Sequence, residues 1–173
     1  VTMPDGSIVL MGGHSGSGNY NDTWRSIDEG ATWTLVNASS GWAKRNHQRS
    51  VVMPDGSIVL MGGHSGSGDY NDTWRSMDGG VTWSEPVVML NLGGAFGGSN
   101  DLVKDSAGTL RAIVAVQGGV YSVSWINHQW VEPELIDGRE IDMHGQHIIV
   151  CQGNQLHTLF YDRTGEMTSW YST

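Results

Sequence analysis

The sequence has one cysteine, no long apolar run and no cluster of positive charge, and each of these absences excludes a class of protein. Cys151 is the only cysteine among 173 residues, so no disulfide can form within the chain, and we expect this thiol to be buried. No stretch approaches the roughly 18 apolar residues that a transmembrane helix needs. The formal net charge is −9 and the nine Lys and Arg residues are scattered, which argues against nucleic acid or an anionic membrane as a partner.

Helix signals are also missing. No window of the sequence keeps a 3.6-residue apolar period for long, and Gly or Pro interrupts most segments of ten residues. The chain instead has 25 Gly, eight Trp and five Tyr, against only two Phe. Many turns, few charges and many Trp are typical of compact all-β structure.

The most informative feature is an internal repeat. Residues 1–37 (the first copy) recur as residues 51–87 (the second copy), with 28 of 37 positions identical. A period of 50 residues this regular predicts that each copy is one supersecondary unit stacked on its neighbour.

The second copy reads as four short strands. Residues 50–53 form a β-rich run that ends in the turn 54–57, where Pro, Asp and Gly favour a hairpin. Residues 57–61 are apolar without alternation, which predicts a strand buried on both faces. A double glycine and a polar loop (64–71) precede two further strands, 72–76 and 81–84. Four antiparallel strands in about 50 residues, repeated, predict a propeller blade.

The turn between the last two strands has the same pattern in both copies, Ser-x-Asp-x-Gly-x-Thr-Trp. We expect the Asp to accept turn amides and the Gly to take a positive φ. The pattern resembles the Asp-box of BNR/sialidase-type propellers, and the preceding Gly-Gly and Asn-Asp-x-Trp resemble a kelch repeat. The resemblance implies that these residues are structural and not catalytic: Ser26, Asp28, Gly30, Thr32, Trp33, Ser76, Asp78, Gly80, Thr82 and Trp83.

In the second half the residues differ from those of the two copies, but the period of the repeat persists. Residues 124–130 resemble a degenerate Asp-box that is one residue short and lacks the Asp and the Gly. Residues 155–161 resemble the BNR-type repeats of sialidase-like proteins. We therefore predict blades at 1–37, 45–88, 98–135 and 140–173, the last incomplete. Two arrangements stay open, a segment of a larger propeller of about six to eight blades, which we favour, and a self-contained four-bladed ring.

The loops and blade connections on one propeller face are the expected binding surface. They offer polar and aromatic side chains of the kind that sugar recognition needs, and we expect exposed Trp42 to contribute to ligand binding without supporting the fold. The candidates are His14, Tyr20, Trp42, Arg45, His47, His64, Asp69, Tyr70, Arg139, Asp142, Tyr161, Asp162 and Arg163.

These residues favour a non-catalytic binding scaffold for protein or glycan, at the cell surface or outside the cell, without cofactor or metal. The histidines lack the spacing of a known metal site, and a calcium site at Asp69 and Asp72 is weakened by Asn19 in the first copy. The alternatives are a sialidase-like glycoside hydrolase module and a purely structural array. Scattered arginines and the lack of a Phe/Tyr-Arg-Ile-Pro segment argue against the hydrolase, while Tyr161-Asp162-Arg163 leaves it open. Self-association through an open blade edge is a further expectation.

Overall fold

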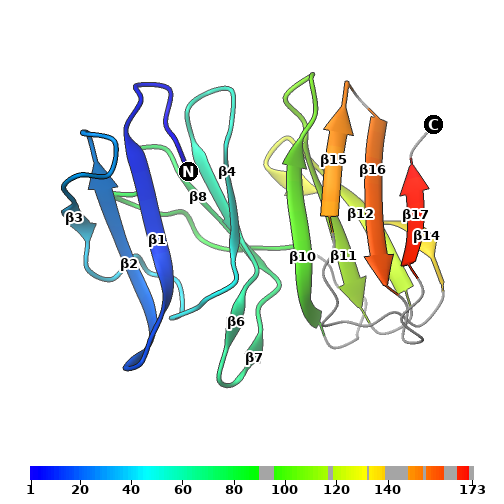
Figure 1. Ribbon diagram of the computed structural model, residues 1–173, viewed down its shortest axis with the longest axis horizontal. Helices are drawn as coiled ribbons and strands as arrows, with labels where there is room; N and C mark the ends of the chain where they lie inside the picture. The colour runs from blue at the N-terminus through cyan, green and yellow to red at the C-terminus, as the bar shows by residue number, and fades with distance from the viewer. Residues whose placement is uncertain are drawn as a thin grey trace. The chain divides into compact units, whose positions relative to one another are not determined.

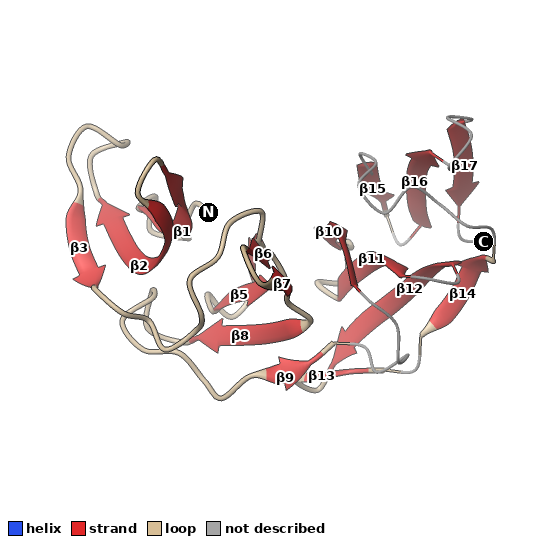
Figure 2. Cartoon of the chain, turned by 90° about the horizontal axis from the view of Figure 1, so that it is seen from below, coloured by secondary structure: helices blue, strands red, loops and turns tan. Residues whose placement is uncertain are grey.

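The chain is built from β-strands in two compact units. The computed structural model describes residues 1–89, 96–116, 119–131, 133–138, 148–153, 155–161 and 167–171. Every regular element among them is a strand (Figure 2), which confirms the all-β prediction. The units are Val1–Val87 and Val88–Thr173. Within the described ranges no helix has the length and apolar character needed to cross a membrane.

The first unit contains two antiparallel sheets and a small hairpin (Figure 1). The first sheet has the order β1-β2-β3, and residues near the N-terminus add a bridge between Thr2 and Ile8 to its edge. The second sheet has the order β4-β5-β8-β9, and the hairpin β6-β7 lies between β5 and β8 in sequence. The strands are β1 (Ile8–Ser15), β2 (Gly18–Ser26), β3 (Thr34–Asn37), β4 (Arg49–Val52), β5 (Ile58–Met61), β6 (His64–Ser65), β7 (Gly68–Asp69), β8 (Asp72–Ser76) and β9 (Val87–Val88).

The core of the first unit forms where one face of each sheet packs together. Val9 and Met11 of β1 cluster with Ile58 and Leu60 of β5, and Trp42 is part of the same cluster. All four residues of β5 are buried, as its unbroken apolar run predicts. The two sheets are therefore joined by an apolar interface, as successive blades are.

The hairpin turns that open each copy repeat in detail. Asp5 and Asp55 each accept bonds from the amide and hydroxyl of the serine two residues later. Gly6 and Gly56 take φ values of 83° and 81°, which a glycine adopts at no steric cost. These turns confirm the hairpin predicted from Pro-Asp-Gly-Ser.

The matching arginines have the structural role that their equivalent positions suggested. Arg25 bonds Asp5 and Ser7 in the first copy, and Arg75 bonds Asp55 in the same way. Each arginine therefore ties its strand to the turn of its own sheet.

The second unit also contains two antiparallel sheets, formed by a different sequence. Its first sheet runs β10-β11-β12-β13, with β14 also pairing β12, and its second runs β15-β16-β17. Ile113, Ala115 and Val120 of the first sheet pack on Leu156 of the second. The strands are β10 (Phe96–Lys104), β11 (Leu110–Val116), β12 (Gly119–Ile126), β13 (Gln129–Trp130), β14 (Glu134–Asp137), β15 (Ile148–Gln152), β16 (Gln155–Tyr161) and β17 (Met167–Tyr171).

The segment of the second unit that resembles a degenerate Asp-box closes as a tight hairpin turn, unlike the Ser-x-Asp-x-Gly-x-Thr-Trp turns of the first unit. Asn127 and His128 both have positive φ, 51° and 63°, between the paired residues Ile126 and Gln129. Two central residues with positive φ define a tight hairpin turn of the kind that suits twisted strands. The turn lacks the aspartate and glycine of its relatives because two residues suffice to close it.

Candidate functional site

The double glycines and the polar segments after them form hairpins, where the sequence suggested loops. In the first copy, β1 and β2 stay paired to the tip, with Gly13 opposite Tyr20 and Ser15 opposite Gly18. The second copy forms the equivalent hairpin as β6 and β7. In Figure 1 both hairpins extend from the same side of the first unit. Two tips of similar sequence therefore stand next to each other.

The connection between the copies joins the two hairpins into one ribbon. Arg45 forms a bridge with Tyr20, and Asn46 forms one with His64. The Asn46 and His64 amides each donate to the carbonyl of the other, at 3.0 and 2.8 Å. A Cβ on Gly63 would lie 2.7 Å from the Asn46 carbonyl oxygen, so the second glycine permits this close approach.

Five polar side chains lie in a line across this ribbon, and we call them the polar row. Residues directly opposite in an antiparallel pair share a face of the sheet, and the ribbon pairs His14 with Asn19, Asn46 with His64, and His64 with Asp69. The bridge between Tyr20 and Arg45 sets Asn19 opposite Asn46. The polar row is His14, Asn19, Asn46, His64 and Asp69.

Hydrogen bonds along the polar row fix the orientation of its side chains. Asn19 Oδ1 accepts from Asn46 Nδ2 at 3.0 Å, and Asn19 Nδ2 donates to the His64 carbonyl at 3.4 Å. The amide oxygen therefore faces His14, whose Nδ1 lies 2.8 Å away and donates. His64 Nδ1 pairs with Asp69 Oδ1 at the same distance.

Each imidazole is thus held through Nδ1, which leaves Nε2 as the ring atom that a ligand would meet. His14 is exposed, and the side chains of His64 and Asp69 are 46% and 18% exposed. The two histidines are three inter-strand spacings apart, about 14 Å. They do not face each other closely enough to share a metal ion, and the described residues contain no group of three or more His, Cys, Asp or Glu that could hold one.

The two tyrosines of the hairpins are placed differently. The Tyr20 hydroxyl lies 2.7 Å from the Ser15 hydroxyl and 2.9 Å from that of Ser17. These hydrogen bonds lower the pKa of Tyr20. The Tyr70 ring instead stacks on the Arg45 guanidinium, with 4.2 Å between the guanidinium carbon and the ring centroid. Tyr20 is exposed, so it is the aromatic side chain of the pair that a ligand can reach.

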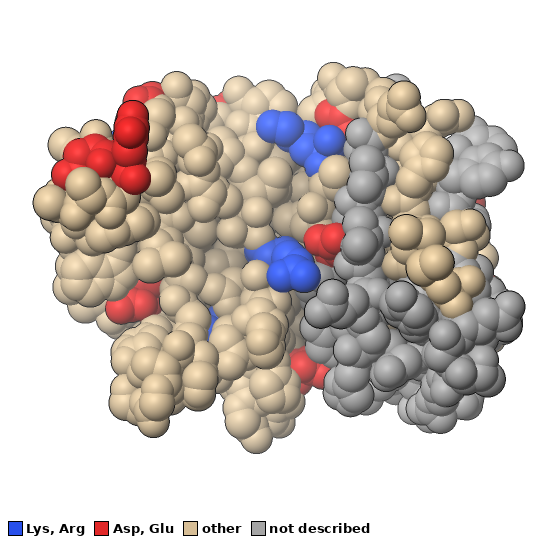
Figure 3. All heavy atoms as spheres, in the orientation of Figure 1, with Lys and Arg blue, Asp and Glu red and all other residues tan. Residues whose placement is uncertain are grey.

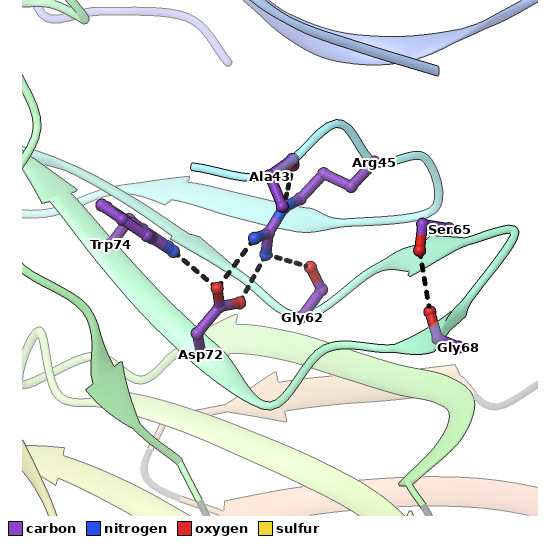
Figure 4. Close-up of polar contacts among 7 residues, drawn as sticks. All are labelled: Ala43, Arg45, Gly62, Ser65, Gly68, Asp72 and Trp74. Carbon is purple, nitrogen blue, oxygen red and sulfur yellow. Dashed lines mark hydrogen bonds and ion pairs between the residues drawn. The ribbon is translucent and has the colours of Figure 1, made fainter. Parts of the chain in front are cut away.

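Arg45 is a buried structural residue, which corrects its assignment as a ligand-binding candidate. Figure 4 shows the guanidinium enclosed by the Asp72 carboxylate and two carbonyls. Nη2 donates to Asp72 Oδ2 at 2.7 Å, Nη1 donates to Asp72 Oδ1 and to the Gly62 carbonyl, and Nε donates to the Ala43 carbonyl. The Arg45 side chain is fully buried. A planar fork matched to a carboxylate is the arrangement in which a buried arginine is best satisfied.

Trp42 also belongs to the core, so the expectation of an exposed aromatic at this position is wrong. Its relative exposure is 1%, and its ring meets Trp83 edge to face with 6.1 Å between centroids. Removing this indole would leave a cavity between the sheets. Trp42 therefore does not offer a stacking surface to a sugar.

The remaining candidates divide into one exposed residue and several that lie outside the described side chains. His47 is exposed and has a positive φ of 55°. Arg139, Asp142, Asp162 and Arg163 lie outside the described residues, and Tyr161 is described only as the last residue of β16.

The Ser-x-Asp-x-Gly-x-Thr-Trp turns are closed by their own side chains. Asp28 accepts from the Thr32 amide and hydroxyl at 2.9 and 2.6 Å and from Ser26 at 2.8 Å. These bonds, led by the Thr32 hydroxyl, lower the pKa of Asp28 to about 2. Gly30 and Gly80 both have a φ of 92°.

The second of these turns repeats the bonding. Asp78 accepts from Thr82 and Ser76 at matching distances. Burial acts to raise the pKa of Asp78, but the bonds from Thr82 and Ser76 outweigh it and lower the pKa. The carboxylates of both turns are therefore used within the turns.

Comparison with known proteins identifies the fold. Residues 4–126 match the model of the DUF6242 beta propeller domain, which is well over half of the chain. This chain belongs to that family. The alternating strands and stacked sheets of the DUF6242 chain are thus those of a β-propeller. No curated protein matches the sequence.

Two solved structures resemble the DUF6242 chain over nearly its whole length. A protein of unknown function from Dyadobacter fermentans DSM 18053 has a TM-score of 0.66 at 13% identity, covering 98% of this chain and 50% of its own. A "putative exo-beta-1,3-galactanase" from Bifidobacterium bifidum s17 has a TM-score of 0.61 at 11% identity, covering 99% of this chain and 65% of its own. At such identities the likeness shows the fold alone. The DUF6242 chain spans only part of the length of both relatives.

The candidates named from the sequence include three of the five residues in the polar row, His14, His64 and Asp69, and they omit Asn46. Asn46 lies in the connection between the copies, where the repeat gives no register, so no pattern placed it opposite Asn19. Its Oδ1 is a buried acceptor without a partner among the described residues. In the DUF6242 chain the polar row therefore has its least satisfied atom at the centre.

Proposed function

We propose that this propeller is a binding module that holds a polyhydroxylated ligand, a glycan, on the polar row. The observation that carries the proposal is the row itself: five hydrogen-bonding side chains aligned by two hairpins that differ in sequence only at Asn19 and Asp69, and by the segment between them. Each hydroxyl of a sugar can donate and accept, and the row offers both functions through imidazole, amide and carboxylate groups. A binding role outside the cell or at its surface fits a chain rich in short, repeated strands.

The finer classification of the repeats belongs to the same proposal. The turn of each copy is closed by an aspartate that accepts from a threonine amide and hydroxyl, and the double glycine precedes an Asn-Asp-x-Trp segment. This bonding supports reading the blades as kelch-like units that carry Asp-boxes. In that reading the turns stabilise the blades, and the hairpins at the other ends of the strands carry the ligand.

The experiment compares the wild-type chain with a His14→Ala/His64→Ala double variant on a glycan array and a protein microarray. Met77→Ala is the matched control, because Met77 is 65% exposed and lies in the turn after β8. We expect glycan signals that the double variant loses and the control keeps, with unchanged circular dichroism. Signals on the protein array alone, lost in the double variant, would replace the glycan by a protein ligand. Binding on either array that survives the double variant would refute the polar row as the site.

A glycoside hydrolase is the second candidate, and the name of the Bifidobacterium relative is the observation that favours it. For this chain the sequence offers Tyr161, Asp162 and Arg163, as in a sialidase-like site. Fluorogenic sialosides and β-galactosides test it directly. Turnover that Tyr161→Phe abolishes would place catalysis ahead of binding.

A further inference from the structure

We infer that the polar row takes an extended, uncharged oligosaccharide that runs across the strands and contacts both copies of the repeat at once. This inference rests on the proposed function and adds the charge, the length and the direction of the ligand. Three features of the row carry it: its span, its charge and its internal symmetry.

The span exceeds what a single small ligand can contact. Five adjacent backbone segments, β1, β2, the connection, β6 and β7, are separated by four gaps and give a row of about 19 Å. Side-chain hydrogen bonds join His14 to Asn19, Asn19 to Asn46 and His64 to Asp69. Backbone bonds join Asn46 to His64. A ligand that uses the whole row must therefore be a chain molecule lying perpendicular to the strands.

The charge of the row selects against anionic sugars. Asp69 is its one acidic residue, and the row has no Lys or Arg. Recognition of a carboxylate or sulfate normally uses an accessible arginine fork, yet the nearby Arg45 is buried and paired with Asp72. Lys44 is the exposed Lys or Arg residue of the same connection, and its ammonium does not offer the planar fork of an arginine. Figure 3 likewise shows that most of the described surface in that view carries neither charge.

The symmetry of the row divides it into two half-sites. His14 with Asn19 and His64 with Asp69 have the same Nδ1 to Oδ1 distance, 2.8 Å, and they come from identical positions of the two copies. In residues 3–26 and 53–76 the copies differ only at Asn19 and Asp69. A polymer with repeated hydroxyl groups can bind both half-sites, and the second contact is then intramolecular, which raises the affinity well above that of either half-site.

The test measures affinity against ligand length. Neutral β-linked galacto- and gluco-oligosaccharides, from monosaccharide to hexasaccharide, are titrated by calorimetry into the full chain. We expect the affinity to rise with length and then level off. His14→Ala and His64→Ala should each weaken the longest ligand about 10-fold, as the loss of one hydrogen-bonding group does, and each should flatten the dependence on length.

A matched substitution tests the charge. Asp69→Asn removes the one carboxylate of the row and makes the second half-site identical to the first. Its affinities for neutral and for acidic oligosaccharides are measured by the same titration. Sialylated and sulfated oligosaccharides should gain affinity in this variant, because a repulsive carboxylate is removed. A wild-type chain that prefers the acidic sugars would overturn the inference.

The inference and the proposed function fail in different ways. Binding of a monosaccharide that only one histidine variant weakens, with no gain from longer chains, overturns the extended ligand and leaves the binding module intact. No binding of any array glycan or oligosaccharide, or binding indifferent to both histidines, overturns both.

Discussion

Leu10 and Leu60 offer a controlled measurement of what the contact between the first two sheets contributes. They are the same residue at the same position of the two copies, and each lies opposite the equivalent tryptophan, Trp24 or Trp74. Their environments differ completely, because Leu60 is 0% exposed and Leu10 is 52% exposed. Leu60 lies in the apolar cluster with Val9.

The expected losses follow from burial. Leu60→Ala removes a side chain from a closed core, so it loses the transfer free energy and leaves a cavity, about 2–5 kcal/mol in total. Leu10→Ala leaves no cavity, and about half of the Leu10 surface is already exposed to solvent in the folded chain. We therefore expect a loss of about 1 kcal/mol or less in the free energy of unfolding. The free energy of unfolding of both variants is measured by urea titration, followed through tryptophan fluorescence. Their difference is the decisive quantity, because contributions common to both variants cancel.

Equal losses in the two variants would refute this reasoning. A large loss for Leu10→Ala would mean that another surface covers Leu10 in solution. Repeating the titration at several protein concentrations then separates the causes, because a loss that shrinks on dilution indicates self-association. A loss independent of concentration would instead mean that the chain itself encloses Leu10.

Three further results are expected. Trp42→Ala should lower the melting temperature and cost about 3–5 kcal/mol of unfolding free energy, and an unchanged melting curve would contradict its place in the core. Arg45→Met should lower the free energy of unfolding by about 3 kcal/mol because it leaves the Asp72 carboxylate without its cationic partner. Arg45→Lys is the milder control in the same thermal assay. Asp28 and Asp78 have lowered pKa values in the folded chain, so their stabilisation is present above about pH 4 and fades as the pH falls toward 2. Asp78→Ala should lower the free energy of unfolding by about 1–2 kcal/mol at neutral pH and weaken the dependence of stability on pH between about 4 and 2. Acid titration followed by circular dichroism checks both.

In the second copy the repeat made three strands and the turns predictable because each signal there is local, whereas the fourth strand, expected at 81–84, is found at Val87–Val88. Asp55, Gly56 and Ser57 close a turn with their own side chains and backbone. The unbroken apolar run of β5 predicts burial on both faces without information from any other segment. Local rules therefore suffice where each residue bonds to near neighbours in sequence.

Composition alone suggests loops at the hairpin tips, because pairing between the two arms of a hairpin leaves little trace in composition. His64-Ser-Gly-Ser-Gly-Asp69 is polar and rich in glycine, which is typical of a loop. The two arms of each hairpin pair with each other, and the connection adds a bridge to one arm of each hairpin, Tyr20 with Arg45 and Asn46 with His64. Such contacts between distant segments decide the structure here, and only the fold brings them together.

The burial of Arg45 shows why nearly identical copies can differ in role. Asp22 and Asp72 occupy the same position, and each accepts from the indole of the tryptophan two residues later, at 2.8 Å. Only Asp72 also receives a guanidinium, because Arg45 is in the connection that precedes the second copy. A Trp, a Lys and an Arg close together in a connection suggest an exposed binding loop to a reader of the sequence. Trp42 and Arg45 are nevertheless core residues, because the Asp72 carboxylate from the neighbouring strand neutralises the arginine, while Lys44 stays exposed. The other exposed polar atoms that remain for a ligand are those of the hairpins.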